Sequence, residues 1–180
     1  MRVVIVYESL FGNTRRIAEA IEEGVRQSHP GADVDCLRVQ EANPDLVEAA
    51  NLLVVGGPTH MRGMTSRMSR KAGLHAVKKE AQQNEQKAPH HETEPDATGP
   101  GVREWFQHLP KTHGKLHAAA FDTRASAPMS GGAARGIARK LRHHGYELAS
   151  EPEGFIIEDA EGPLRDGELA RAQAWGATLN

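Results

Sequence analysis

Runs of apolar residues alternate along this chain with segments whose apolar residues recur at helical spacing. The runs 3–6 and 52–55 are apolar at every position, which is typical of strands covered on both faces. Strands are predicted at 3–6, 34–39, 52–55, 116–121 and 155–157. Helices are predicted near 17–25, at 44–50, 65–81, 102–109 and 132–141, and after Asp166, which we expect to cap the last helix with Leu169 and Leu179 on its inner face. Apolar strands that alternate with helices predict an α/β fold with a doubly wound sheet.

Residues 82–100 interrupt this pattern. The stretch contains three prolines, many Gln, Glu and His residues, and almost nothing apolar, so it cannot bury enough surface to offset its ordering entropy. We therefore expect a single domain, 1–180, with a mobile polar insertion at about 82–100 that makes few buried contacts. The adjacent His90 and His91 lie in this stretch without a ligand pattern around them, and no metal site is predicted.

Composition excludes several classes of protein. A formal net charge of −2 over 180 residues gives no sign of nucleic-acid binding. Cys36 is the single cysteine and lies in the predicted strand 34–39, where a buried, inert thiol is expected rather than a disulfide. No leader or membrane span is recognised, and we expect a cytoplasmic protein.

The most informative stretch is the turn between the first strand and the first helix. Gly12 allows a ligand to approach the backbone closely, while Ser9, Asn13 and Thr14 offer side chains that form hydrogen bonds. The free amides of the first helical turn face outward together with the positive end of the helix dipole, which favours a phosphate. An ordinary capped helix remains the alternative. The candidate ligand-binding residues of this turn are Ser9, Leu10, Phe11, Gly12, Asn13 and Thr14.

Two common phosphate-binding patterns do not fit this turn. No Gly-Lys-Ser/Thr follows Gly12, and a single glycine does not make G-x-G-x-x-G. The turn resembles instead the phosphate loop of the flavodoxin family, Thr/Ser-x-Thr-Gly-x-Thr, which holds the terminal phosphate of flavin mononucleotide (FMN). Ser9, Gly12 and Thr14 match it, whereas Phe11 replaces a hydroxyl residue and offers only its amide.

The turn after 52–55 strengthens the resemblance. Pro58, Thr59 and Gly63 match the family's Pro-Thr-Trp-x-x-Gly loop, and His60 stands where the tryptophan that packs on the flavin is common. The resemblance implies that the peptide between Met61 and Arg62 faces flavin N5, and a positive φ at Met61 would cost about 1 kcal/mol. The implied flavin contacts of this loop are Pro58, Thr59, His60, Met61, Arg62 and Gly63.

The resemblance places a third flavin loop after the strand 116–121. Asp122, Thr123 and Arg124 occupy that position and could bond the pyrimidine edge of a flavin, but no aromatic residue lies between Asp122 and Gly132. Trp105 falls on the apolar face of helix 102–109, so we expect it in the core rather than over a flavin.

As a whole, the resemblance implies a flavodoxin-like five-stranded parallel sheet of order 2-1-3-4-5 with helices on both faces, and noncovalent FMN that carries electrons between redox partners. It implies no catalytic residue of the chain, since the redox chemistry belongs to the flavin. We expect the partner, a reductase or acceptor protein, to present an acidic patch to the basic helix at 133–144. The basic residues assigned to its outer surface are Arg135, Arg139, Lys140, Arg142, His143 and His144.

Two alternative functions remain open, and a third fails. An NAD(P)H-dependent flavin or quinone reductase would use the same fold, but no nicotinamide site is recognised. A flavin-free binding module would explain Phe11, His60 and the missing aromatic residue of the third loop. A response-regulator receiver needs an aspartate at the end of the third strand, where this chain has Gly56 and Gly57.

Overall fold

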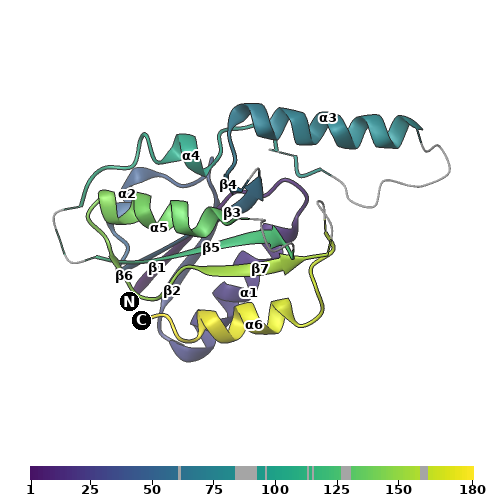
Figure 1. Ribbon diagram of the computed structural model, residues 1–180. Coiled ribbons are helices and arrows are strands. Elements are labelled where there is room, and N and C mark those ends of the chain that lie inside the picture. The colour runs from purple at the N-terminus through teal and green to yellow at the C-terminus, as the bar shows by residue number, and fades with distance from the viewer. Residues whose placement is uncertain are drawn as a thin grey trace.

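Strands and helices alternate along most of the described chain (Figure 1). The computed structural model describes residues 1–60, 62–83, 93–95, 97–112, 114, 116–126, 131–158 and 162–180. Its elements are β1 (Arg2–Tyr7), α1 (Asn13–Ser28), β2 (Asp33–Arg38), α2 (Pro44–Glu48), β3 (Leu52–His60), β4 (Gly63–Met64), α3 (Arg67–Gln83), α4 (Val102–Trp105), β5 (His117–Ala125), α5 (Ala133–His143), β6 (Glu147–Leu148), β7 (Glu153–Ile157) and α6 (Glu168–Gly176).

The sheet has the expected flavodoxin-like order. Its parallel strands follow one another as β2, β1, β3 and β5, and two short strands share the fifth position. Of these, β6 pairs with the start of β5 and β7 with its end. The short strand β4 forms an antiparallel hairpin with the tip of β3. With β6 and β7 counted as one strand, the order is 2-1-3-4-5, which confirms the prediction.

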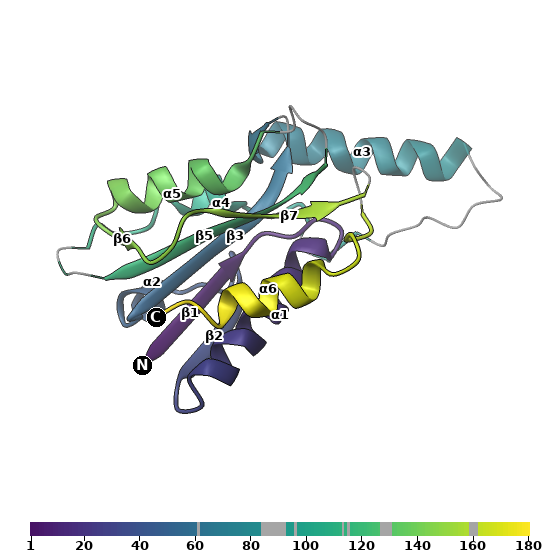
Figure 2. The same cartoon turned by 60° about the horizontal axis from the view of Figure 1, so that its bottom comes forward.

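Helices cover both faces of this sheet (Figure 2). On one face, α1 and α6 pack over Val3 and Ile5, and on the other, α2, α4 and α5 pack over Val4 and Val6. All four of these β1 side chains are fully buried. Each contributes about 1.5–3 kcal/mol relative to an exposed position, which explains the apolar run. Trp105 lies in the second of these layers, as predicted.

Two predicted turns are strand instead. The strand β3 continues through Gly56 to His60, and β5 continues to Ala125, because the two pair with each other as far as Pro58 and Thr123. Gly56 is needed for packing rather than for a turn. A Cβ there would lie 2.0 Å from Cζ of Phe121.

The start of the last helix also differs from the prediction. Gly167, with a φ of +85°, is the N-cap of α6, and Asp166 is not. Glu168 organises this turn, since its Oε2 accepts a 2.6 Å hydrogen bond from the Ile156 amide. Leu169 is exposed rather than inward-facing, while Leu179 is buried as expected.

The helix α3 extends away from the rest of the domain in both views (Figures 1 and 2). Arg70 is buried near its start, and beyond Arg70 none of the side chains that the structure describes on this helix is buried. Among the described residues, no helix is long and apolar enough to cross a membrane.

The structure describes only part of the predicted mobile insertion. Residues 84–92 and 96 lie outside the described residues, so mobility there stays a prediction. Residues 93–95 and 97–100 return to the domain, where Ala97 is 5 % exposed and the Glu94 amide donates a 2.8 Å hydrogen bond to Leu10 O. At Glu94 and Ala97, the expectation of few buried contacts is wrong.

Candidate functional site

The first loop, which we define as residues 9–14 and which leads from β1 into the first turn of α1, presents backbone amides at the start of that helix. Gly12 is the N-cap of α1 with a φ of +83°, a conformation that favours glycine. The Gly12 amide donates to Ser9 Oγ at 3.1 Å, and the Arg15 amide is 3.4 Å from the same atom. A hydroxyl oxygen thus occupies the point on which two amides converge, where a phosphate oxygen would accept hydrogen bonds.

The second half of the chain supports this loop. The hydroxyls of Thr14 and Thr123 are 2.8 Å apart and buried, which joins the first turn of α1 to β5. Asn13 packs against the backbone of Gly162, where a Cβ would lie 2.4 Å from Asn13 Nδ2. Both contacts reduce the freedom of the loop before any ligand binds.

A cleft opens beside the loop at the carboxyl ends of the strands, where ligands bind in doubly wound sheets. Hydroxyl and amide groups line it together with apolar side chains. The lining residues are Leu10, Phe11, Asn13, Thr14, Pro58, Thr59, His60, Thr123 and Ile157. The structure therefore brings the first and second predicted loops together, with Thr123 alone from the third.

His60 lines this cleft, and Arg62 follows it two residues later. Burial lowers the pKa of His60, and the charge of Arg70 lowers it further, so the imidazole is neutral at neutral pH. His60 packs against Gly73 of α3, so closely that a Cβ on Gly73 would lie 3.2 Å from Cε1 of His60. Arg62 has a φ of +72°, at a cost of about 1 kcal/mol, and its carbonyl accepts from the Gly132 amide at 3.3 Å. The predicted strain at Met61 falls outside the described residues.

Asp122 and Arg124 do not line the cleft. Asp122 is fully buried under the start of α5, where its Oδ2 accepts a 2.8 Å hydrogen bond from the Ala134 amide. Burial raises the pKa of its carboxyl, and the hydrogen bond from Ala134 and the charge of Arg124 oppose that rise. Arg124 lies 3.6 Å from Asp122 Oδ1 and donates to Gly131 O at 3.3 Å. Both side chains bind the protein itself.

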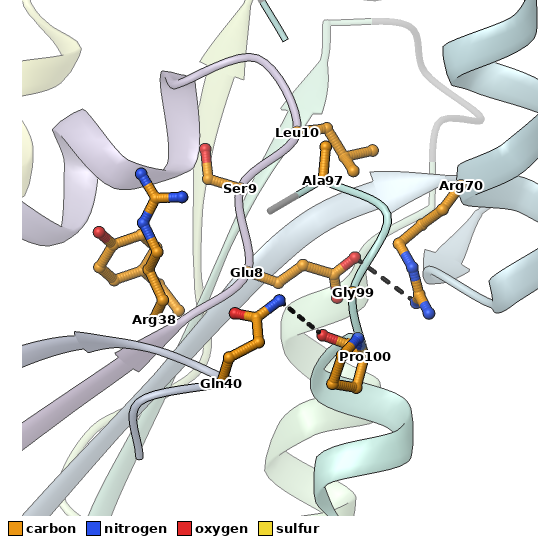
Figure 3. Close-up of a pocket in the computed structure, with 10 residues that line it drawn as sticks. Glu8, Ser9, Leu10, Arg38, Gln40, Arg70, Ala97, Gly99 and Pro100 are labelled. Atoms are coloured by element: carbon orange, nitrogen blue, oxygen red, sulfur yellow. Dashed lines mark hydrogen bonds and ion pairs between the residues drawn. The ribbon is translucent and has the colours of Figure 1, made fainter. Parts of the chain in front are cut away.

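A buried acid that the sequence analysis missed lies on the other side of the first loop (Figure 3). The Glu8 carboxylate accepts hydrogen bonds from the Thr65 hydroxyl and, at 2.9 Å, from the Val102 amide, and it lies 3.7 Å from Arg70 Nη1. Burial raises its pKa. The sequence signal that could have revealed Glu8 is its position directly after a fully apolar strand.

Glu94 is a second acidic residue beside the first loop that the sequence analysis missed. Its carboxylate pairs with Arg15 Nε at 2.8 Å and with Arg38, and a Cβ at Gly12 would lie 3.1 Å from its Oε1. Glu94 thus covers the outer side of the first loop. No sequence signal predicts this, because its two partners are 79 and 56 residues away along the chain.

Comparison with known proteins finds similarity to flavodoxins. The flavodoxin family model matches residues 5–92. A flavodoxin from Aquifex aeolicus (strain VF5) is 38 % identical over 69 residues, which cover 38 % of this chain and 37 % of that protein. An NAD(P)H dehydrogenase (quinone) from Geobacter sulfurreducens is 49 % identical over 49 residues, which cover 27 % of this chain and 24 % of that protein. The matches span well under half the length of either relative.

The chain is similar to the flavodoxin family over residues 5–92. Its fold is flavodoxin-like throughout the described residues: oxidised flavodoxin 1 from Bacillus cereus superimposes with a TM-score of 0.64 at 16 % identity, covering 99 % of this chain and 96 % of that one. The family match ends at residue 92, and Thr123 and Gly162, which lie beyond it, contact Thr14 and Asn13 of the first loop.

Proposed function

We propose that this flavodoxin-like protein binds one FMN in the cleft beside the first loop and carries electrons through it between redox partners. The observation that carries the proposal is the convergence of the Gly12 and Arg15 amides on one oxygen at the start of a helix. Such a group of donors fits a phosphate, and the adjacent cleft offers the apolar side chains of Leu10, Phe11 and Ile157 to a planar ring system.

Each part of the cleft then has a task. The amides of Gly12 and Arg15 and the hydroxyls of Ser9 and Thr14 hold the phosphate. Phe11, with Leu10, Pro58 and Ile157, keeps water from the ring. FMN supplies the electron-accepting chemistry when bound, and the chain supplies binding, orientation and electrostatics. The neutral His60 places no charge against the ring.

Titration of the purified apoprotein with FMN, riboflavin and flavin adenine dinucleotide tests the proposal. We expect FMN to bind at least tenfold more tightly than riboflavin, because only FMN carries the phosphate that the loop holds. Equal affinity for FMN and riboflavin would show that the loop is not engaged. Failure of all three flavins to bind would favour the flavin-free binding module.

A second candidate function has an observation in its favour, namely the similarity to the quinone-reducing dehydrogenase. In that case the FMN-loaded protein should consume NADPH or NADH in the presence of benzoquinone, with turnover that saturates in the nucleotide. A rate that does not exceed that of free FMN at the same concentration would leave the electron carrier as the proposal.

An acidic partner on the basic side of α5 stays a prediction, and it competes with a second basic surface, on α3. Arg135, Arg139, Lys140 and Arg142 are exposed there, whereas His144 is buried, so its assignment to the outer surface is wrong. The Ala133 amide bonds Thr59 Oγ1 beside the cleft, while the other end of α5 lies at the opposite edge of the sheet, where the His144 carbonyl accepts from the Thr112 amide. Only the first turn of α5 therefore borders the cleft.

A further inference from the structure

The side of α3 that faces away from the domain carries a row of basic residues. Arg67, Lys71, His75 and Lys79 follow one another at intervals of four, which places them along one side of the helix. All four are exposed. At 1.5 Å per residue, this row is about 18 Å long. We call these four residues the α3 row.

The middle of the α3 row lies level with the cleft. Gly73, between Lys71 and His75, is the α3 residue that packs against His60, and His60 lines the cleft. Lys71 and His75 each lie about 3 Å from Gly73 along the helix axis. Figure 2 shows α3 leaving the domain at the edge where the strands end.

The α5 side differs in this respect. Arg135 is about 3 Å along the axis from Ala133, the residue of α5 that bonds Thr59 at the cleft. Arg139 and Arg142, however, are about 9 and 13 Å from Ala133. A partner that covered those residues would lie over the far end of the domain. Most of the α5 charge therefore lies toward the far end of the domain, whereas the middle of the α3 row lies level with the cleft.

An apolar side chain accompanies the α3 row. Met68 is 82 % exposed and follows Arg67 directly on the helix. Positive charge around an exposed, adaptable apolar side chain is suited to a protein surface with acidic residues around an apolar centre. A nucleic acid fits less well, because the chain as a whole has a formal charge of −2.

We propose that α3 is the docking surface for an acidic redox partner protein, which the α3 row guides to the mouth of the cleft. This proposal rests on the proposed function, since it names the partner surface of the electron carrier. Charges of opposite sign at an interface mainly raise the association rate, and salt screens them. Docking through α3 should therefore weaken steeply as salt is added.

The test compares two pairs of charge reversals. The double variant Lys71→Glu/Lys79→Glu alters the α3 row, and Arg139→Glu/Arg142→Glu is the matched control, with the same change of net charge at exposed helical positions. The probe is a [2Fe–2S] ferredoxin chosen for a strongly acidic surface. Its binding to the immobilised protein is measured with and without FMN, at 20 and 300 mM salt. With FMN, the rate of flavin reduction by the reduced ferredoxin is measured as well.

We expect the α3 variant to bind the ferredoxin at least tenfold more weakly at 20 mM salt and to accept electrons correspondingly more slowly, while the α5 variant changes by less than twofold. Equal effects, or a larger effect of the α5 variant, would overturn the proposal. So would unchanged ferredoxin binding in the α3 variant. Binding of a DNA duplex or of phosphatidylserine vesicles that exceeds ferredoxin binding, and that is lost in the α3 variant, would reassign the surface.

The two proposals can fail separately. If FMN does not bind but the ferredoxin still binds the apoprotein through α3, the electron carrier is wrong and the docking surface stands. If FMN binds and the ferredoxin is indifferent to the α3 row, the docking surface is wrong and the flavin site stands. Unchanged circular dichroism of both variants confirms that the reversals leave the fold intact.

Discussion

The first loop and the end of β5 lie at the same edge of the sheet and carry similar polar residues, but they use them differently. In the first loop, the amides of Gly12 and Arg15 converge on a single oxygen beside the cleft. At the end of β5, Asp122 accepts a hydrogen bond from the Ala134 amide, and Arg124 donates one to Gly131 O just before α5. Of these three residues of β5, only Thr123 lines the cleft.

The difference follows from the backbone of each region. Successive residues of a strand point to opposite faces, so Thr123 turns toward α1 while Asp122 turns toward α5. A loop before a helix has no such alternation, and its free amides all point outward along the helix axis. Polar residues near a ligand-binding edge therefore indicate a ligand contact only when their direction is also known.

The largest expected effect is at Gly12. A valine there must adopt the left-handed conformation and meets the Glu94 carboxylate, 3.1 Å from the Cβ position. We expect Gly12→Val to weaken FMN binding at least 100-fold in a fluorescence titration, because the loop amides can no longer converge.

A matched control separates backbone strain from the loop itself. Gly167 is also a helix N-cap with almost the same φ, +85°, but a Cβ there meets no atom within 4 Å. Gly167→Val should lower the free energy of unfolding by about 1–2 kcal/mol and leave FMN affinity within twofold. Equal loss of FMN in both variants would mean that global destabilisation, not the loop, explains the result.

The second prediction tests the other region through Asp122. Replacing it with alanine leaves the Ala134 amide without its buried acceptor, so we expect Asp122→Ala to lower the free energy of unfolding by about 2 kcal/mol. FMN affinity of the folded protein should change by less than threefold, since the side chain lies outside the cleft. A much larger loss of FMN at unchanged stability would place Asp122 at the ligand.

The pH dependence of Asp122 sharpens this result. Burial raises the pKa of Asp122 in the folded chain above its usual 3.8, so its contribution to stability is present below the unfolded pKa and is lost as pH rises through the folded pKa. Asp122→Asn does not titrate. The free energy of unfolding of this variant, measured by urea titration, should therefore rise relative to that of the original protein as pH goes from 4 to 8.

A smaller effect joins the two regions. Thr14→Val and Thr123→Val each remove one end of the 2.8 Å hydroxyl contact, and each should lower the free energy of unfolding by about 1 kcal/mol. The double variant should lose less than the sum, with a coupling energy near 1 kcal/mol in a double-mutant cycle. Additive losses would show that the two hydroxyls do not support each other.

The smallest expected effect is the titration of His60. Its lowered pKa means that its contribution to stability is present above the unfolded pKa and is lost as pH falls through the folded value. Proton NMR should show the His60 ring titrating below its usual 6.5, and FMN affinity should stay flat between pH 7 and 8. A titration above 6.5 would place a negative charge against the ring that the structure does not show.

The sequence predicted the fold better than the site. Fully apolar runs such as 3–6 mark buried strands, which predicted the doubly wound fold, and the resemblance of the turn at Gly12 to the flavodoxin phosphate loop implied the sheet order. The ends of β3 and β5 were not predicted, because Gly56 signals a turn until the ring of Phe121 is seen beside it. Glu94 could not be predicted at all, since it contacts Arg15 and Arg38 across a long stretch of chain without periodicity.

The hydrogen bonds of Glu8 bear on where the chain can accept inserted residues. Glu8 accepts hydrogen bonds from Thr65, just before α3, and from the amide of Val102, at the start of α4. One buried carboxylate thus joins the two ends of the segment 65–102. Once these ends are fixed, the free energy of closing the loop rises only logarithmically with its length, by about 0.6 kcal/mol for each doubling. The position between Thr65 and Val102 is therefore a place where the domain can accept an additional module while its sheet keeps its register.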